Sequence, residues 1–219
     1  MIDLMTIPGE SSLIDEALKS QLSGIFGKME GQVAIKAIVD LSREKDSQMA
    51  AFLNTIAALS PKLELTLYGP EDEDRPMELD ASHLPVTGLY KDGAYGRVSF
   101  HGIPGGKEMN AFVLAVYNLA GPGQEVPKGV RKKIDRLKKR TNIKVCVSLA
   151  CHHCAGVVAA CQQIAILNPN IEAEMIDAAL YEDLIAQYKI ERVPMIIFND
   201  KEIHMGGKTI EEILALLKK

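Results

Sequence analysis

The chain has 219 residues, 47% of them apolar and 5% aromatic, which is enough to build one large or two small compact domains. Its formal net charge of −4 argues against nucleic acid or an anionic membrane as a partner, and no apolar run reaches the roughly 20 residues of a membrane span. Four cysteines are too few for a disulfide scaffold, so we expect a cytoplasmic protein in which a close cysteine pair serves metal or redox chemistry.

The first half of the chain predicts several strands and a helix. Apolar runs predict strands at 32–40 and 62–70, and another strand begins near Pro85. Residues 96–120 then combine a last strand, a double glycine and a helix. The acidic stretch EDEDRPMELD precedes Pro85, and we expect it to form a loop in place of a helix.

A basic segment follows at 127–140, with eight Lys and Arg residues. Val130, Ile134 and Leu137 fall at helical spacing, which predicts a helix with one face packed on the protein and a solvated basic face. Such a face could instead dock an acidic redox partner. The acidic remainder of the chain disfavours nucleic-acid binding by this segment.

The second half predicts the element order βαβαββα. The strands and helices are expected at 142–149, 153–167, 171–177, 180–190, 194–198, 201–205 and 208–217. The first half repeats this plan at an offset of about 110 residues, with Pro85 corresponding to Pro194. We therefore predict two related units, 1–122 and 142–219, joined by a linker helix at 123–141.

Cys151 and Cys154 lie where the first strand of the second unit gives way to its first helix. At the same offset the first unit has Leu41 and Glu44, so it is expected to carry no dithiol. A permanent structural disulfide is disfavoured because it would close only a short loop.

Zinc is the main alternative for the CHHC sequence. A structural zinc site needs four ligands, and the other histidines, His83, His101 and His204, are scattered. Cys146 lies inside a strand and Cys161 on an apolar helix face, so both are expected to be buried and inert. We therefore predict no metal site.

A redox-active dithiol fits the sequence best. The thiolate is the attacking species, and a helix start stabilises negative charge, so we expect Cys151 to attack and Cys154 to resolve. His152 and His153 would stabilise the reduced form if they carry positive charge. Alternatively, both histidines are exposed side chains with little effect on the sulfur atoms.

The element order, the dithiol and the Val193-Pro194 pair together resemble the thioredoxin fold. The tandem as a whole resembles the N-terminal domain of the alkyl hydroperoxide reductase F subunit, in which two fused thioredoxin-like folds share one dithiol, and it is related to glutaredoxin-like protein disulfide oxidoreductases. Matching stretches are SFHGIPGGKEMNAFVLAVYNLAG, SLACHHC, LNPNIEAEMID, VPMIIFNDKE and TIEEI. Two residues depart from the family pattern: Ala155 replaces the usual proline, and His153 a common asparagine.

This resemblance implies an α/β fold of two thioredoxin-like units packed into one compact body with a continuous sheet. It implies a thiol-disulfide oxidoreductase that carries electrons from a flavoprotein disulfide reductase to a peroxiredoxin or a similar disulfide substrate. The alternatives are a general glutaredoxin-like reductase with broad targets and a non-catalytic binding module. No G-x-G-x-x-G motif occurs, so the redox-active disulfide Cys151–Cys154 is expected to act without a bound flavin or nicotinamide.

The resemblance also assigns roles to residues outside the CHHC sequence. It implies a cis peptide bond before Pro194 and a Val193 backbone that pairs with an extended segment of the partner. In the family, a glutamate after the double glycine of the first unit approaches the dithiol, and PGGKEM places Glu108 there. Glu108 would then accept the proton of Cys154; otherwise it only complements the dipole of the following helix.

Overall fold

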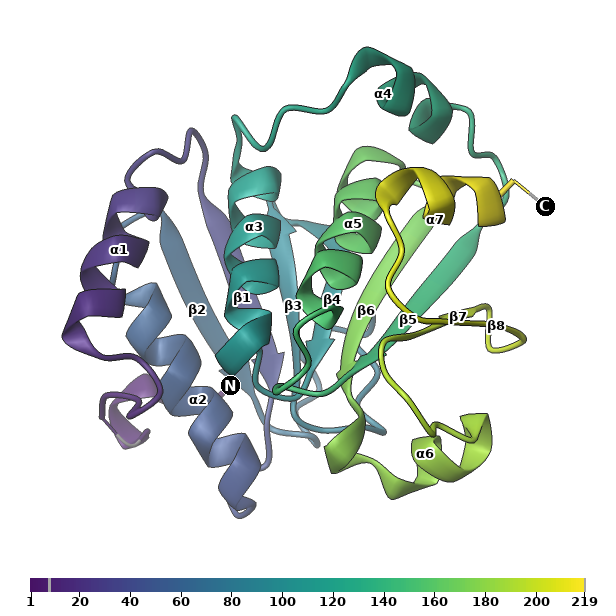
Figure 1. Cartoon of the computed structure of the whole chain (residues 1–219). Coiled ribbons are helices and arrows are strands. Elements are labelled where there is room, and N and C mark those ends of the chain that lie inside the picture. The colour runs from purple at the N-terminus through teal and green to yellow at the C-terminus, as the bar shows by residue number, and fades with distance from the viewer. Residues whose placement is uncertain (8, 219) are drawn as a thin grey trace.

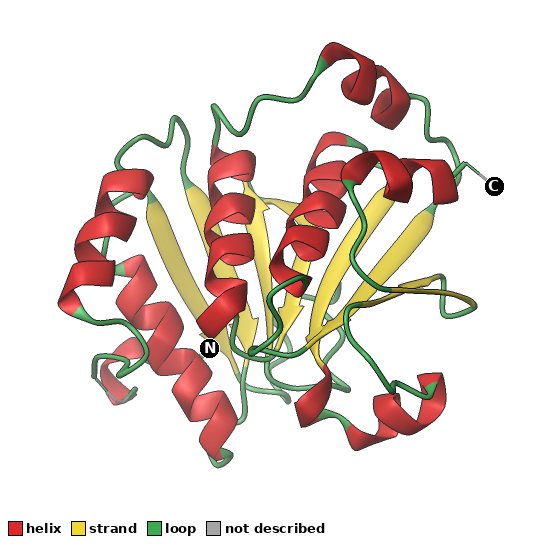
Figure 2. Ribbon diagram, viewed as in Figure 1, coloured by secondary structure: helices red, strands yellow, loops and turns green. Residues whose placement is uncertain are grey.

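The computed structural model describes residues 1–7 and 9–218, so position 8 of the predicted first unit and position 219 of the predicted second unit lie outside the described residues. The chain forms one eight-stranded sheet, with most of its helices against one face (Figures 1 and 2). Among the described residues, no helix is long and apolar enough to cross a membrane.

The first unit places a short turn and a helix before its first strand. Its elements are η1 (Leu4–Thr6), α1 (Glu16–Phe26), β1 (Val33–Ile38), α2 (Glu44–Ala57), β2 (Leu63–Tyr68), β3 (Val86–Lys91), β4 (Ala94–His101), η2 (Gly106–Glu108) and α3 (Met109–Ala120). Between β2 and β3, residues 69–85 form turns and contain no helix, which confirms the expected loop.

The second unit follows the basic segment and has the predicted order of elements. They are α4 (Lys128–Asp135), β5 (Thr141–Val147), α5 (Cys154–Leu167), β6 (Ile171–Asp177), η3 (Ala178–Leu180), α6 (Glu182–Tyr188), β7 (Met195–Phe198), β8 (Glu202–Met205) and α7 (Ile210–Leu216). Two predicted ranges were too long: the helix expected at 180–190 is a 3₁₀ turn followed by the shorter α6, and α7 is shorter than 208–217.

The strand order is β2-β1-β3-β4-β6-β5-β7-β8. It shows the same arrangement of strands in the two units and the place where the units are joined. In each unit the first strand pairs in parallel with the second and antiparallel with the third. The two units meet where β4 pairs in parallel with β6, with Val98 opposite Ala173 and Phe100 opposite Met175. The predicted continuous sheet is therefore confirmed.

One core runs across both units on the helical face of the sheet. Alternate strand residues point to opposite faces, and Val145 and Phe100 belong to the same buried cluster as residues of α2, α3 and α5. Phe112 of α3 contacts Phe52 of α2 and Phe100 of β4, with ring centroids 6.0 and 5.2 Å apart. Two smaller clusters lie on the other face, one beneath α6 and one beneath the loop between β2 and β3.

The basic segment packs as its apolar spacing predicts. Val130, Ile134 and Leu137 are buried, and α4 contacts α5 and α7. The side-chain amide of Asn168 donates to the carbonyl oxygens of Ile134 and Leu137, at 2.6 and 3.2 Å. Asn170 donates to the Leu137 carbonyl as well, at 3.0 Å, so the end of α4 is tied to the second unit.

Candidate active site

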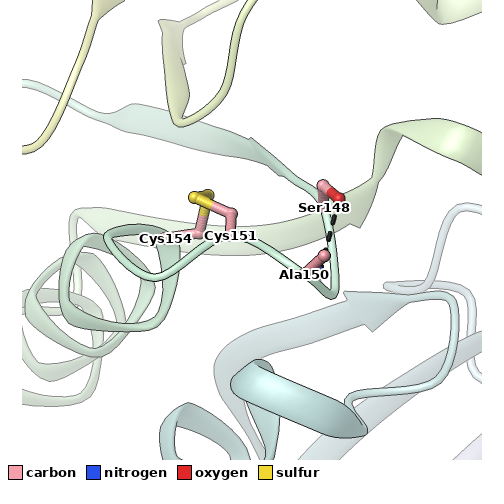
Figure 3. The surroundings of a disulfide bond; sticks show 4 residues. All are labelled: Ser148, Ala150, Cys151 and Cys154. Carbon is pink, nitrogen blue, oxygen red and sulfur yellow. Dashed lines mark hydrogen bonds between the residues drawn. A yellow bond between two sulfur atoms is a disulfide. The ribbon is translucent and has the colours of Figure 1, made fainter.

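The two cysteines of the CHHC sequence form a disulfide (Figure 3), and the two residues differ in exposure. Cys154 is fully buried, whereas Cys151 is half-buried, and their Cα atoms are 5.6 Å apart. The backbone N–H of Cys151 donates to the Ser148 carbonyl at 2.8 Å, which closes the turn between β5 and α5. Cys151 is therefore the more accessible of the two residues, whereas Cys154 is covered.

The helix begins later than the sequence suggested. We expected it at 153–167 with Cys151 at its start, but α5 begins at Cys154 and Cys151 lies in the preceding turn. His153 occupies the cap position, and its side chain makes no capping hydrogen bond. The first N–H groups of α5 thus remain available to stabilise negative charge on a nearby sulfur atom.

The Val193–Pro194 segment has the expected backbone conformation. Its peptide bond is cis, and the Pro194 carbonyl accepts a hydrogen bond from the Gly206 N–H at 2.9 Å. Pro194 is buried, and Val193 is half-buried against the main core. His152 and His153 are both exposed. A Cβ atom at Gly207 would lie 3.8 Å from the Cβ of His153, so the loop after β8 lies beside the dithiol turn.

Glu108 reaches the dithiol helix from the first unit. It ends η2, which contacts α5, and the neighbouring Lys107 N–H donates to the Leu149 carbonyl at 3.2 Å. The Glu108 side chain is fully buried, and neither of its oxygen atoms has a hydrogen-bond partner among the described residues. Burial first, and the negative charge of Asp177 second, raise its pKa to about 7.

Asp177 was not among the residues predicted for the site; it ends β6 opposite Val147 at the end of β5. It is buried, and burial raises its pKa, although a hydrogen bond from the Ala179 N–H and the charge of Lys45 act in the opposite direction. Its position was visible as the last residue of the predicted strand 171–177, where parallel strands end close together.

Cys146 and Cys161 are free and buried. Burial raises the pKa of both thiols to about 12, so they are far from the ionised, reactive form at neutral pH. Among residues 1–7 and 9–218, no group of three or more His, Cys, Asp or Glu side chains is arranged to hold a metal ion.

The first unit has a different set of contacts at the place that corresponds to the dithiol. Leu41 is half-buried, and Glu44 is the exposed first residue of α2, as Cys154 is the first residue of α5. The Arg43 guanidinium donates to the Leu84 carbonyl at 3.2 Å, just before the cis bond to Pro85. Pro85 accepts from the Gly102 N–H at 3.0 Å, as Pro194 does from Gly206. The backbone plan is therefore repeated without the sulfur atoms.

Known proteins share this architecture. The profile of the thioredoxin domain matches residues 141–218. In Staphylococcus aureus (strain Mu50), the F subunit of alkyl hydroperoxide reductase is 30% identical over 205 residues, which cover 94% of this chain and 38% of that protein. The chain thus spans 38% of the length of the curated relatives that it matches.

Two solved structures cover nearly the whole chain. The F subunit of the Enterococcus faecalis alkylhydroperoxide reductase (AhpF), as a C503A mutant, is 35% identical with a TM-score of 0.87, covering 94% of this chain and 100% of that one. The NTD_N/C domain of the same organism's AhpF is 37% identical with a TM-score of 0.86, covering 93% and 99%. The chain belongs to the AhpF N-terminal domain family.

As a member of the AhpF N-terminal domain family, the chain is a thiol-disulfide oxidoreductase with a CxxC site at Cys151 and Cys154. A protein disulfide oxidoreductase from Aeropyrum pernix shares the fold at 21% identity, with a TM-score of 0.81 over 100% of this chain and 94% of that one. Tandem thioredoxin folds in one continuous sheet therefore occur beyond the AhpF family.

Proposed function

We propose that this chain is a dithiol electron carrier that accepts electrons from a flavoprotein disulfide reductase and passes them to the disulfide of a peroxiredoxin. The observation that supports it most directly is the contrast between the half-buried Cys151 and the fully buried Cys154 before α5. The relatives are named for alkyl hydroperoxide reduction, which motivates a peroxiredoxin as the acceptor. The cytoplasm is the proposed compartment, because its reducing pool keeps such dithiols in turnover.

In the reduced carrier, Cys151 is the proposed nucleophile. Its thiolate attacks one sulfur of the partner disulfide, forming a mixed disulfide and releasing the other partner sulfur as a thiolate that takes up a proton. Cys154 then loses its proton and attacks Cys151, which re-forms the intramolecular disulfide and releases the second partner sulfur. The partner gains two electrons and two protons, and the carrier loses the same.

Glu108 is the proposed acceptor for the proton of Cys154. Cys154 is buried, so its proton needs a nearby base, and η2 brings Glu108 against α5. A pKa of about 7 lets the carboxyl group take up and release a proton near neutral pH. Burying a carboxylate without a hydrogen-bond partner costs free energy, and a glutamate that only complemented the helix dipole would not need to be buried. The burial of Glu108 therefore favours the catalytic role.

The Val193–Pro194 segment is the proposed contact for the partner backbone. Val193 is half-buried beside the buried Pro194, and its main chain precedes β7, next to the strand that leads into the dithiol turn. An extended partner segment can pair with such a backbone while its disulfide meets Cys151. His152 and His153 lie exposed at the rim, where positive charge would favour the thiolate.

A reconstituted electron-transfer chain tests this function. A purified flavoprotein disulfide reductase, NADH, this chain and a peroxiredoxin should consume NADH on addition of an alkyl hydroperoxide. Insulin in place of the peroxiredoxin tests the broad-range alternative, because a general reductase would reduce both at similar rates. No NADH consumption with either acceptor, using a carrier that dithiothreitol reduces, would refute the proposed role.

A further inference from the structure

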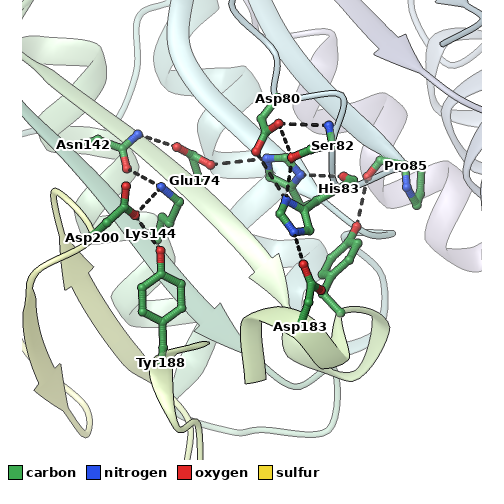
Figure 4. A network of polar contacts seen from close by, with 12 residues as sticks. Asp80, Ser82, His83, Pro85, Asn142, Lys144, Glu174, Asp183, Tyr188 and Asp200 are labelled. Carbon is green, nitrogen blue, oxygen red and sulfur yellow. Dashed lines mark hydrogen bonds and ion pairs between the residues drawn. The ribbon is translucent and has the colours of Figure 1, made fainter. Parts of the chain in front are cut away.

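The sheet face opposite the shared core has a polar seam between the two units (Figure 4). A cavity of about 170 Å³ lies there, and its lining includes Asp80, His83 and His101 of the first unit and Lys144, Tyr188 and Asp200 of the second. Its polar side chains are linked by hydrogen bonds and ion pairs that run from the first unit to α6.

His83 connects the two units across this seam. Its Nε2 lies 2.7 Å from a carboxylate oxygen of Asp183 in α6, although the two residues are 100 apart in the sequence. Its Nδ1 lies 3.3 Å from Asp80 and 3.0 Å from the Ser82 hydroxyl. Ser82 in turn donates its N–H and its hydroxyl to Asp80. The loop that replaces the missing helix of the first unit therefore fixes the ring of His83.

Tyr181 adds a second link beside His83. It precedes α6, is buried, and donates its hydroxyl to the Pro85 carbonyl at 3.4 Å. The rings of His83 and Tyr181 meet edge to face with centroids 5.3 Å apart, and His101 lies 6.3 Å from the same tyrosine ring. The start of α6 thus rests on the first unit through an ion pair, a hydrogen bond and ring contacts.

The other end of α6 is tied within the second unit. The Tyr188 hydroxyl donates to Asp200 at 2.7 Å, and Lys144 donates to the same carboxylate at 2.7 Å. After Tyr188, the chain turns through Lys189 in the left-handed conformation and continues to Val193. The position of α6 therefore determines where the chain enters the Val193–Pro194 segment.

We propose that His83, by holding Asp183 and the start of α6, is a positioning residue for the Val193–Pro194 segment and so for docking of the partner disulfide. The unit without a dithiol would then control how tightly the other unit binds its substrate. This inference rests on the proposed function in one respect, the pairing of a partner backbone with Val193.

The charges around His83 make this contact depend on pH. The titratable groups that face it are Asp80, Asp183, His101 and Tyr181. Burial alone would lower the pKa of His83, but the hydrogen bonds and charges of Asp183 and Asp80 outweigh burial and raise it. A raised pKa means that the contact is strongest while His83 is protonated and weakens as the pH rises through that pKa.

Two disulfide probes separate docking from dithiol chemistry. The full chain is reduced with dithiothreitol, desalted and oxidised in single turnover by a disulfide-form peroxiredoxin or by the small disulfide dithionitrobenzoate. We expect His83→Gln and Asp183→Asn each to raise the half-saturating peroxiredoxin concentration about two- to fivefold near pH 6. The rate with dithionitrobenzoate should stay unchanged, and the double variant should be no worse than either single variant. Above the pKa of His83, wild type should need as much peroxiredoxin as the variants.

Asp135→Asn is the matched control. It makes the same chemical change in the exposed Arg131–Asp135 pair on α4, 2.9 Å long, and should leave both probes unchanged. Equal half-saturation in wild type and His83→Gln at both pH values would overturn the inference, and so would an equal loss with the small disulfide. A wild-type chain that reduces dithionitrobenzoate but not the peroxiredoxin disulfide would instead overturn the docking function on which the inference rests.

Discussion

The two units place different residues at the same point of the same fold. In the second unit the first strand leads to Cys151 and Cys154, with a half-buried Val193 nearby. In the first unit the Arg43 guanidinium holds the carbonyl of Leu84, so a hydrogen-bonding group of that backbone is already occupied. The fold therefore supplies geometry in both units, whereas the chemistry resides in a few side chains at one helix start.

The first unit, which carries no dithiol, nevertheless contacts the dithiol helix α5 at both ends. Near its start, η2 contacts α5, and the Lys107 N–H donates to the Leu149 carbonyl in the turn before the helix. At its end, the Arg97 guanidinium donates to the Ala165 and Ile166 carbonyls, both at 3.1 Å. The comparison indicates that the unit without sulfur chemistry supports its neighbour, and four experiments test this view.

The largest effect is expected at the sulfur atoms themselves. Cys151→Ser should reduce disulfide reduction to below about one per cent of wild type, because it removes the attacking thiolate. Cys154→Ser should keep a reactive thiol and accumulate a mixed disulfide with the partner, visible on a non-reducing gel. Faster labelling of Cys154 than of Cys151 by limiting iodoacetamide in the reduced protein would contradict the assignment.

Removing the first unit should destabilise the second. Residues 140–219 alone would expose the edge of β6 and the part of the core that α3 and β4 cover. We expect this fragment to melt at least about 20 °C below the full chain, or to show no cooperative transition. An equal melting temperature together with full peroxiredoxin reduction by the fragment would show that the first unit is dispensable.

Glu108→Gln should slow partner reduction about 10- to 100-fold and remove a rate increase around pH 7. It should also stabilise the protein at alkaline pH. A folded-state pKa of about 7 lies above the ordinary 4.5, so ionisation of Glu108 lowers the free energy of unfolding as the pH rises through this range, by roughly 3 kcal/mol. The variant should lack that fall in urea denaturation.

The exposed Glu44 provides a control for Glu108, because the same substitution can be made there, at the start of α2 in the first unit. Glu44→Gln should leave the rate of partner reduction unchanged. Identical pH profiles for wild type and Glu108→Gln would assign Glu108 a purely structural role.

The smallest effect is expected at Arg97. Arg97→Ala should cost about 1–3 kcal/mol of stability through lost hydrogen bonds at the end of α5. Arg97 has a φ of 61°, a left-handed conformation that glycine adopts without strain. Arg97→Gly should therefore be less destabilising than Arg97→Ala by about 1 kcal/mol, and both should keep wild-type rates with dithionitrobenzoate. The reverse order of stability would mean that the backbone conformation is not costly.

Local patterns were enough to predict much of the fold. The apolar runs at 32–40 and 142–149 became the central parallel strands of the two units, and the acidic loop before Pro85 was expected correctly. Helix α2 was not identified from its own pattern, although Met49, Phe52 and Ile56 mark one of its faces at helical spacing. It was implied by the repeat, because the offset of about 110 residues places a counterpart of the helix predicted at 153–167 at this point of the first unit. Helix α1 was missed; only Leu22 and Phe26 are buried along it, so its apolar pattern is short.

The polar seam around His83 could not be derived from local patterns. The pairing of His83 with Asp183 joins positions 100 residues apart, and it depends on β4 lying beside β6. Nor does any neighbour of Arg97 signal its left-handed backbone. The placement of Glu108 at the dithiol helix followed from the family resemblance, since composition alone also fits a residue that complements the helix dipole.

The parallel pairing of β4 with β6 also determines how the molecule opens. The amide hydrogens of β4 and β6 lie in the middle of the sheet, beneath a core to which both units contribute. They can exchange with solvent only when strands of both units separate, so the two halves should open as one cooperative block. The frayed positions should instead be at the outer strands: among residues 1–7 and 9–218, β8 pairs with a strand on one side only, and β2 has only the isolated bridge from Ile2 to Leu67 on its other side.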